Sequence, residues 1–206
     1  MSEPQPVVFV IDDEPSVRKS LGRLLAAAGF RVEAFASAQD FLQRPPDDAL
    51  SCALLDIQMP GLNGLELQQA LLGAHRALPI VFITGHGDIP TSVRAMRAGA
   101  VDFLSKPFDE QDLLAAVTRA LEKAGQEQHT HVESAAAEAR LATLTPRERE
   151  VLLHVLAGEL NKQIAAALGA SIKTIKVHRG RVMHKMQVQS VADLVRRCEK
   201  AGVRLP

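Results

Sequence analysis

The sequence predicts an α/β fold, a five-stranded doubly wound parallel sheet, followed by a small all-α domain. Three observations support this prediction. Five short apolar runs alternate with helical patterns over the first 120 residues, whereas the chain looks helical throughout from Leu144 onward. The net charge also changes sign, from −5 over residues 1–120 to +7 over residues 143–206. An acidic front and a basic tail suggest two partners of different charge, and nucleic acid is the natural partner of the tail.

The five apolar runs are predicted to be buried strands, because short runs rich in Val and Ile fit strands covered on both faces. They are VVFVI (7–11), RVEAF (31–35), CALLD (52–56), IVFIT (80–84) and DFLSK (102–106). Helical patterns lie between them, over residues 17–28 and around 38–43, 65–72 and 90–98, and a last helix begins near Asp109. Repeated strand–helix alternation favours a doubly wound parallel sheet, whose functional site lies at the carboxyl ends of the strands.

Residues 122–142 change character, because they are polar and rich in alanine. We interpret them as a linker, partly helical, between a first domain over residues 1–121 and a second over residues 143–206. His129 and His131 lie within this linker. A solvated pair of histidines fits them better than a metal site.

Start and stop signals divide the second domain into four helices. Thr145, Pro146 and Glu148 form a capping box that begins the first helix. The N-caps of the three later helices are expected at Asn161, Ser171 and Ser190. Gly169 suits the position just after the second helix, and only a few residues separate that helix from the third. This spacing indicates a helix-turn-helix.

Composition narrows the setting of the protein. The 206 residues include seven Phe but no Tyr or Trp, which disfavours base stacking on aromatic side chains. We expect no signal peptide and no transmembrane segment. The two cysteines, Cys52 and Cys198, lie far apart and do not suggest a disulfide framework. These features together predict a cytoplasmic protein that does not associate with a membrane.

Five polar residues end predicted strands: Asp12, Asp13, Asp56, Thr84 and Lys106. Because the carboxyl ends of parallel strands meet at one edge, these side chains should converge. Three close carboxylates repel one another, so they need a divalent cation to stay ionised together, and oxygen ligands suit Mg²⁺. A carboxylate can attack phosphorus to form an acyl phosphate. Asp56, on the central strand, is the best nucleophile, and Thr84 and Lys106 would contact the phosphoryl oxygens.

The polar residues at the strand ends lie within four sequence motifs. They read V-x-V-I-D-D at 8–13, L-L-D-I-x-M-P-G at 54–61, F-I-T-G at 82–85 and F-L-x-K-P-F at 103–108, with a Gly64 turn. Over residues 6–121 the chain therefore resembles the receiver domain of two-component response regulators, which has a flavodoxin-like fold.

This resemblance implies that Asp56 takes a phosphoryl group from a sensor histidine kinase. The implied Mg²⁺ ligands are Asp13 and Asp56 directly, the backbone carbonyl of Gln58, and Asp12 through water. Thr84 and Phe103 are implied to move together on phosphorylation. Receivers commonly hold a cis peptide before the proline of the last motif, so we predict that Lys106–Pro107 is cis.

The third helix of the second domain reads SIKTIKVHRGRVMHKM. Ile175, Val182 and Met186 fall on one face, at spacings of seven and four residues. The cations left toward solvent are Lys173, Lys176, Arg179, Arg181 and Lys185. A basic helix after a tight turn favours contact with DNA phosphates and the major groove.

Residues 143–202 resemble the LuxR/FixJ-type helix-turn-helix, and the two halves in this order resemble the FixJ-like branch of regulators. The resemblance implies that Lys176, Val177 and position 180 face base edges. It implies backbone contacts by Lys173, Thr174, Arg179, Arg181 and Lys185. Position 180 departs from the pattern because it is Gly, which costs a helix about 1 kcal/mol relative to Ala. The change either removes one side chain from base reading or lets the helix approach the DNA more closely.

Coupling between the two domains requires a two-state element, and the face of the fourth helix and fifth strand is the expected one. A self-complementary patch is expected there from Ile89, Val93, Arg94, Arg97 and Asp102. In a two-fold homodimer formed on phosphorylation, each Arg could meet the partner's Asp. The dimer would bind paired half-sites in double-stranded promoter DNA and act on RNA polymerase.

Three other classes of protein fit less well. A phosphatase of the haloacid-dehalogenase type needs a second Asp two residues after the nucleophile, where this chain has Gln58. A dinucleotide-binding protein needs G-x-G-x-x-G after the first strand, where this chain has Asp12-Asp13-Glu14-Pro15. The basic helix-turn-helix argues against a plain protein-interaction module. We therefore expect no enzymatic activity other than self-phosphorylation and self-dephosphorylation.

Overall fold

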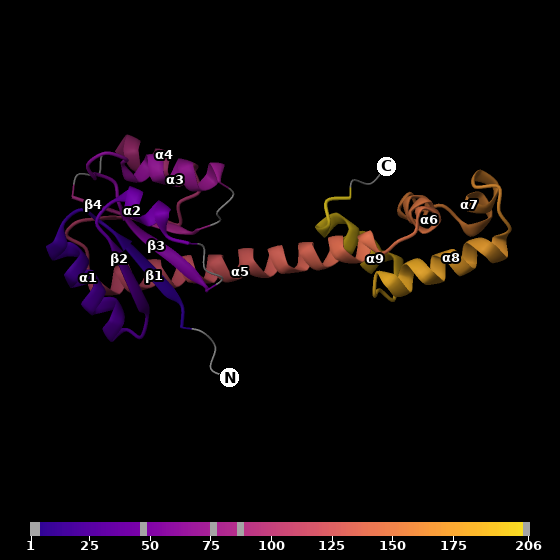
Figure 1. Ribbon diagram of the computed structural model, residues 1–206, viewed down its shortest axis with the longest axis horizontal. Helices are drawn as coiled ribbons and strands as arrows, with labels where there is room; N and C mark the ends of the chain where they lie inside the picture. The colour runs from indigo at the N-terminus through magenta and orange to yellow at the C-terminus, as the bar shows by residue number, and fades with distance from the viewer. Residues whose placement is uncertain (1–4, 46–48, 75–77, 86–88, 204–206) are drawn as a thin grey trace. The chain divides into compact units, whose positions relative to one another are not determined.

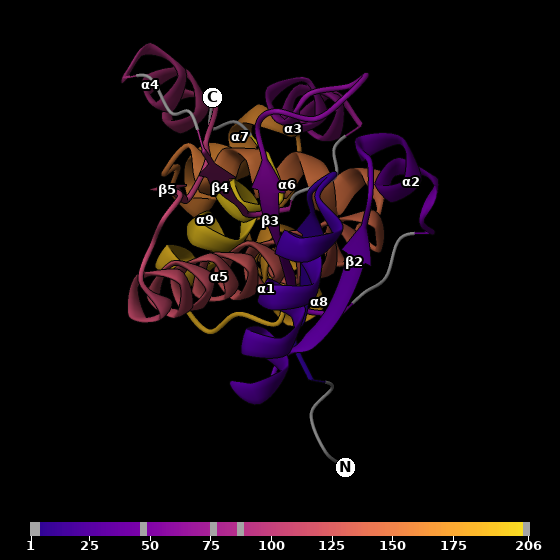
Figure 2. The ribbon, with the colours of Figure 1, turned by 90° about the vertical axis from the view of Figure 1, so that its left-hand side faces the viewer.

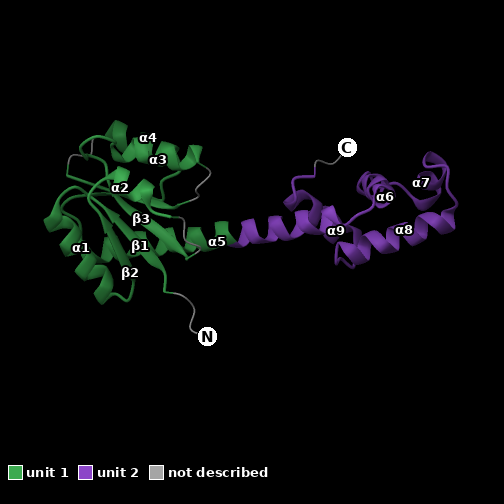
Figure 3. Ribbon diagram, viewed as in Figure 1, with its two compact units in different colours: residues 1–128 green, residues 129–206 purple. Residues whose placement is uncertain are grey.

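A computed structural model describes residues 5–45, 49–74, 78–85 and 89–203. The chain folds as two compact units, residues 1–128 and residues 129–206 (Figure 3). Each unit has its own hydrophobic core. No helix within the described ranges is long and apolar enough to cross a membrane.

Unit 1 is built on a parallel sheet of five strands (Figure 1). The strands are β1 (Val7–Ile11), β2 (Arg31–Phe35), β3 (Ser51–Asp56), β4 (Ile80–Thr84) and β5 (Asp102–Ser105). Their order is β2-β1-β3-β4-β5, and every neighbouring pair is parallel. The predicted sheet is confirmed. β1 and β4 are buried along their whole length and β3 from Cys52 onward, because helices cover both faces of the sheet.

The helices of unit 1 lie on both sides of the sheet (Figure 2). They are α1 (Pro15–Ala27), α2 (Ala38–Gln43), α3 (Gly64–Gly73), α4 (Ile89–Arg97) and the first part of α5 (Glu110–Ala142). α1 and α5 cover one face, where Leu25 and Val117 join the core around Leu54. α2, α3 and α4 cover the other face, around Leu55 and Phe82. The doubly wound arrangement is therefore confirmed.

Aromatic side chains belong to unit 1 alone. All seven Phe residues precede residue 109. Phe9, Phe35 and Phe41 form a cluster beside β2, with ring centroids 5.2–6.2 Å apart. The guanidinium of Arg44 lies 4.5 Å above the ring of Phe9. The core of unit 2 is aliphatic by contrast.

α5 is one uninterrupted helix of 33 residues. Residues 122–142, which the sequence predicts to be a partly helical linker, are helical throughout. Leu113 and Val117, in its first half, are buried in the core of unit 1. Leu141, near its end, is buried in the core of unit 2. Gly125 sits within the helix, where an added Cβ would meet Leu50 Cδ1 at an ordinary 3.8 Å.

Unit 2 continues with four helices after the end of α5. They are α6 (Pro146–Leu156), α7 (Asn161–Ala167), α8 (Ile172–Lys185) and α9 (Val191–Lys200). Thr145 and Glu148 form the predicted capping box, and Ser171 and Ser190 cap α8 and α9 as predicted. Gly169 follows α7 with a φ of 59°, as its predicted place requires.

The predicted N-cap at Asn161 is wrong by one residue. The cap is Leu160, whose backbone N–H donates to Oε1 of Gln163 at 2.7 Å. Because Gln163 satisfies this end of the helix, the side chain of Asn161 is available elsewhere. Its Oδ1 accepts a hydrogen bond from Nη1 of Arg179 on α8, at 3.1 Å. The residue ties α7 to α8 instead of capping a helix.

Candidate functional site

The five polar residues predicted to converge lie at the carboxyl edge of the sheet in unit 1. Oxygen atoms of Asp12, Asp13 and Asp56 lie within 4.8 Å of one another. Nζ of Lys106 lies 2.9 Å from Oδ2 of Asp12 and 3.6 Å from Oδ2 of Asp56. Thr84 is fully buried at the end of β4, and its carbonyl accepts a hydrogen bond from the backbone N–H of Lys106 at 2.7 Å. The edge thus holds three carboxylates and one ammonium group.

Backbone contacts fix the orientation of the acidic residues. Oδ1 of Asp12 accepts from the backbone N–H of Glu14 at 2.8 Å, and its carbonyl accepts from Nη1 of Arg18 at 2.6 Å. Oδ1 of Asp56 accepts from the backbone N–H of Gln58 at 3.3 Å. Arg18 was not predicted as a site residue. Its one possible signal is its place on the first turn of the helix that follows Asp12 and Asp13.

Gly64 explains how α3 can pack directly against the end of β3. A Cβ at position 64 would lie 2.3 Å from the carbonyl oxygen of Asp56, closer than any real contact. The backbone N–H of Gly64 instead donates to the carbonyl of Ile57 at 3.0 Å. Only Gly allows this close approach, and it holds the backbone of Asp56 in place.

Burial and charge act in opposite directions on Asp56. Burial raises the pKa of Asp56, the charge of Lys106 lowers it, and the charge of Asp12 raises it again. The net effect is a pKa above that of an ordinary aspartate. Burial tends to lower the pKa of Lys106, but its hydrogen bond to Asp12 and the charge of Asp56 outweigh this and raise it. The ammonium therefore stays charged beside the carboxylates.

The donor atoms at this edge fit Mg²⁺. Three carboxylates whose oxygens lie this close provide hard ligands around one point, which suits a cation that keeps several waters. Asp12 and Asp56 are buried, so a cation there would offset a repulsion that solvent screens poorly. The Lys106–Pro107 peptide is cis, as predicted. Phe103 is half-buried against the core and lines a pocket of about 270 Å³ with Pro107 and Phe108.

The outer side of α8 in unit 2 carries much of the predicted basic surface. Ile175, Val182 and Met186 are buried as predicted. The exposed predicted DNA contacts are Lys173, Thr174, Lys176, Val177, Gly180 and Arg181. Within the described part of the chain, none of the three cations in this set forms an ion pair. They are free to bind phosphate.

Two other predicted DNA contacts have partners inside unit 2. Nζ of Lys185 lies 2.6 Å from Oε2 of the buried Glu148 and 2.9 Å from the carbonyl of Thr143. Arg179 donates to Asn161. Both side chains join α8 to neighbouring elements, and sequence patterns did not reveal this because the partners are 37 and 18 residues away.

The predicted dimer face lies on α4 and β5. Ile89 is 79% exposed and Val93 is 41% exposed, with Met96 45% exposed on the same side of α4. Arg94 and Arg97 are also exposed. The carboxylate of Asp102 is already paired with Arg119 of α5 in the same chain. Asp102 must therefore leave Arg119 before it could meet an Arg of a second copy.

Both halves of the chain match known families. Residues 8–118 match the response regulator receiver domain, and residues 142–198 match the luxR family of bacterial regulatory proteins. Nodulation protein W of Bradyrhizobium diazoefficiens is 47% identical over 96% of this chain and 87% of its own length. Transcriptional regulatory protein FixJ of the same organism is 42% identical over 95% of this chain and 96% of its own length.

Solved structures agree with the sequence comparisons. The structure of response regulator StyR is 46% identical, covers 96% of this chain and 100% of its own, and superposes with a TM-score of 0.83. Full-length FixJ from B. japonicum is 42% identical, covers 96% of this chain and 98% of its own, and has a TM-score of 0.57. Both similarities extend over the two units.

Proposed function

Because the chain belongs to the two-component response regulators that join a receiver domain to a LuxR-type DNA-binding domain, we propose that Asp56 is its phosphoryl acceptor and a sensor histidine kinase its donor. The observation that supports this assignment is the grouping of the carboxylates of Asp12, Asp13 and Asp56 beside Lys106. Nζ of Lys106 lies 3.6 Å from Oδ2 of Asp56. The protein is a transcription regulator. Its chemistry is limited to gaining and losing its own phosphoryl group.

The residues at the edge have distinct roles in this proposal. A carboxylate oxygen of Asp56 forms a bond to phosphorus while the bond from phosphorus to the kinase imidazole breaks, and the imidazole keeps that electron pair. Lys106 and the hydroxyl of Thr84 contact the phosphoryl oxygens. Asp13 and Asp56, with the carbonyl of Gln58, would hold Mg²⁺ directly, and Asp12 would hold it through water. When bound, Mg²⁺ offsets the charge of the carboxylates and the phosphoryl oxygens.

Labelling with a small phosphoryl donor tests the acceptor. Acetyl phosphate and Mg²⁺ should add one phosphoryl group to the wild-type chain and none to Asp56→Asn, read by intact-protein mass spectrometry. Asp40→Asn, an exposed change on α2, is the matched control and should be labelled like the wild type. Equal labelling of Asp56→Asn and wild type would place the acceptor elsewhere.

For the second unit we propose that α8 enters the major groove of double-stranded promoter DNA in the cytoplasm. Lys176, Val177 and Gly180 would face bases, and the remaining predicted contacts would touch the DNA backbone. Exposure of Lys173, Lys176 and Arg181 without an ion pair in the described ranges supports this. RNA polymerase is the proposed downstream partner.

Salt titration of DNA binding tests this surface. Removing one phosphate-binding cation should reduce the slope of log affinity against log salt concentration by about 1. We expect this for Lys173→Ala and not for Lys123→Ala, whose cation lies in unit 1. If both variants kept the wild-type slope, Lys173 would not contact phosphate.

We also propose that phosphorylation dimerises the receivers through α4 and β5. Ile89 and Val93 supply exposed apolar surface, and Arg94 and Arg97 supply charge for the Asp102 of a second copy. Phe103 on β5 lines a pocket with Pro107 and Phe108, and we propose that its ring moves together with Thr84 on phosphorylation. Sedimentation should show a phosphorylated dimer that Val93→Asp abolishes. Leu72→Asp, equally polar but on α3, should leave the dimer intact; loss of the dimer in both variants would count against a specific face.

A further inference from the structure

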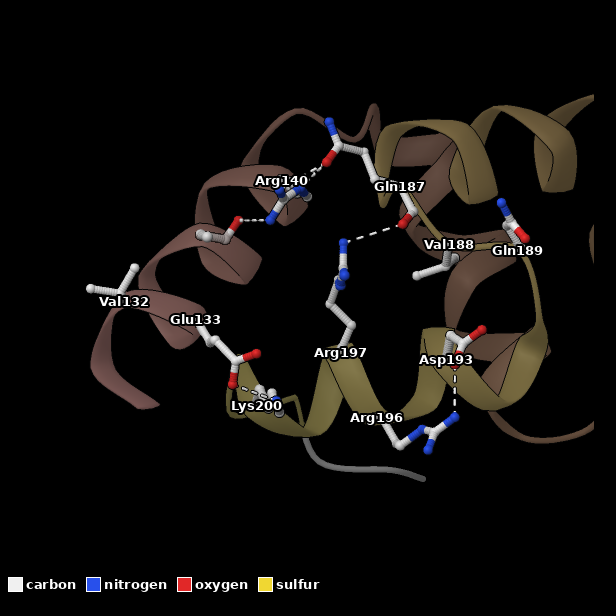
Figure 4. A pocket seen from close by; sticks show the side chains of 11 residues that line it. Val132, Glu133, Arg140, Gln187, Val188, Gln189, Asp193, Arg196, Arg197 and Lys200 are labelled. Atoms are coloured by element: carbon white, nitrogen blue, oxygen red, sulfur yellow. Dashed lines mark hydrogen bonds and ion pairs between the residues drawn. The ribbon is translucent and has the colours of Figure 1, made fainter. Parts of the chain in front are cut away.

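A separate pocket lies within unit 2 and plays no part in the proposed mechanism. It has a volume of about 610 Å³, within the usual range of small-molecule sites. The C-terminal part of α5, the α8–α9 turn and α9 form its walls (Figure 4). None of its lining residues belongs to the proposed DNA contacts. The pocket therefore offers a binding site independent of the α8 surface.

The lining is polar and carries a net positive charge. Four cations and two carboxylates line it. Nζ of Lys200 lies 2.5 Å from Oε2 of Glu133, and Nη2 of Arg196 lies 2.7 Å from Oδ1 of Asp193. Within each of these two ion pairs, the positive and negative charges cancel. Neither Arg140 nor Arg197 forms an ion pair among the described residues. The hydrogen bond from Lys200 lowers the pKa of Glu133, and the charges of Lys200, His129 and Arg197 add to this effect.

Neutral oxygens hold these two arginines in place. Nε and Nη2 of Arg140 donate to Oε1 of Gln187 at 3.1 and 2.8 Å, and its Nη1 donates to the carbonyl of Ala136 at 3.1 Å. Nη1 of Arg197 donates to the carbonyls of Met186 and Gln187 at 2.8 and 3.3 Å. Such bonds orient a guanidinium group but do not cancel its charge. Figure 4 shows Arg197 projecting into the middle of the pocket, with Arg140 at its edge.

The turn that both arginines hold directly follows the end of α8. Gln187 is the one non-glycine residue of the described ranges with a positive φ, at 51°. This is the position just after the C-cap of α8, where a left-handed residue commonly ends a helix, and the backbone N–H of Val188 donates to the carbonyl of Met183 at 3.0 Å. Here the conformation presents both the side chain and the carbonyl of Gln187 to the arginines. Guanidinium groups fixed in this way lose little freedom when an anion binds.

We propose that this pocket binds a small dianion, carried by phosphate or by two carboxylates, between Arg140 and Arg197. Arg140 and Arg197 are half-buried residues, so solvent screens their attraction for an anion less than that of fully exposed cations. Each has further N–H donors available for bidentate contact. A bound dianion bridges α5, which carries Arg140, to α9, which carries Arg197, and stabilises their packing within unit 2.

Isothermal titration of the full chain tests the proposal. The experiment is run in EDTA at constant ionic strength, with inorganic phosphate and succinate as the two probes and chloride as the screening control. Binding of phosphate alone, or of succinate alone, identifies which oxygen group the site takes. Arg140→Gln should weaken binding roughly tenfold or more, because it removes hydrogen bonds to a charged ligand. Arg196→Gln, a lining cation already paired with Asp193, should change it less than about twofold.

Two further variants guard against indirect effects. Ala136→Glu keeps both guanidinium groups and adds a carboxylate to the lining, so it should abolish anion binding while circular dichroism shows unchanged helix content. Lys106→Gln removes the cation at the carboxyl edge of the sheet in unit 1, and this variant should bind the anions like the wild type. Loss of binding in Lys106→Gln, equal loss in the two arginine variants, or no binding by the wild type would overturn the proposal. None of these results bears on phosphorylation of Asp56.

Discussion

The carboxylate of Glu148 is buried in unit 2, and one cation, Lys185, stabilises its charged form. Only 2% of the residue is exposed. The hydrogen bond from Lys185, followed by the backbone N–H of Thr145, lowers the pKa of Glu148 to about 2. A pKa lowered by folding stabilises the native state above the unfolded value of 4.5, and this contribution is lost as pH falls toward about 2. Unit 2 should therefore lose stability in that acidic window.

Lys185→Met tests the structural role of this pair. The change leaves a buried carboxylate without its charged partner, so we expect a loss of about 3 kcal/mol in the free energy of unfolding. Glu148→Gln should cost less, because no buried charge remains. Urea unfolding at neutral pH measures both. Were Lys185→Met as stable as wild type but weak in DNA binding, Lys185 would serve as a DNA contact alone and would not stabilise unit 2.

Gly64 provides a residue-scale test of how Asp56 is positioned. Gly64→Ala should force α3 away from the carbonyl of Asp56, because the new Cβ would otherwise lie 2.3 Å from it. Such overpacking costs about 1–3 kcal/mol. We expect slower labelling by acetyl phosphate, together with lower stability. Gly73→Ala, whose Cβ would meet nothing within 4 Å, is the control and should label at the wild-type rate.

At the scale of the element, α8 contains a glycine that its fold does not need. A Cβ on Gly180 would meet nothing within 4 Å. Gly180→Ala should therefore stabilise unit 2 by about 0.5–1 kcal/mol, measured by thermal unfolding. DNA affinity distinguishes the two interpretations of this position. A drop in affinity despite higher stability would indicate that the helix approaches DNA closely at Gly180, and unchanged affinity would indicate only a missing side chain.

α4 is held to α3 by a buried side chain. Gln68 is 3% exposed, and its Nε2 donates to the carbonyls of Ala95 and Ala98 at 3.4 and 3.2 Å. Ala95 is the only buried residue of α4, so few apolar contacts hold the helix. Gln68→Leu should remove the donor from the carbonyl of Ala98, whereas the carbonyl of Ala95 still accepts from the backbone N–H of Ala100 at 3.2 Å; we expect a cost of about 1–3 kcal/mol. Hydrogen exchange of the α4 amides should quicken; unchanged protection would show that the helix does not depend on Gln68.

The elements that the sequence predicted best are those whose signal is local. Buried parallel strands are continuous apolar runs, so β1 and β4 were predicted residue for residue, and their ends brought Asp12 and Thr84 to one edge. Thr145 and Glu148 were recognised as a cap because they lie three residues apart. The partners of long side chains could not be predicted this way. That Glu148 is buried, and so requires Lys185, depends on packing between helices distant in sequence.

At the scale of the whole molecule, the separate cores predict separate unfolding events. The core of unit 2 contains no residue of the sheet, and that of unit 1 contains none after Leu121. Leu152→Ala should lower the free energy of unfolding of unit 2 by about 2–5 kcal/mol and leave the thermal transition of unit 1 in place. Leu54→Ala should destabilise unit 1 and leave the transition of unit 2 in place. Calorimetry distinguishes the two. A single transition that both variants shift together would mean that α5 makes the units unfold as one.

The confinement of phenylalanine to unit 1 has an optical consequence. A chain with no Tyr or Trp absorbs weakly in the near ultraviolet and has almost no intrinsic fluorescence there. Light absorbed by bound nucleic acid, or emitted by one introduced indole, is then recorded against a dark background. Phe103→Trp would place the sole emitter beside the receiver edge, and Leu153→Trp, at a 45% exposed position of α6, would place it in unit 2. Each half of the chain can thus report its own events without a dye.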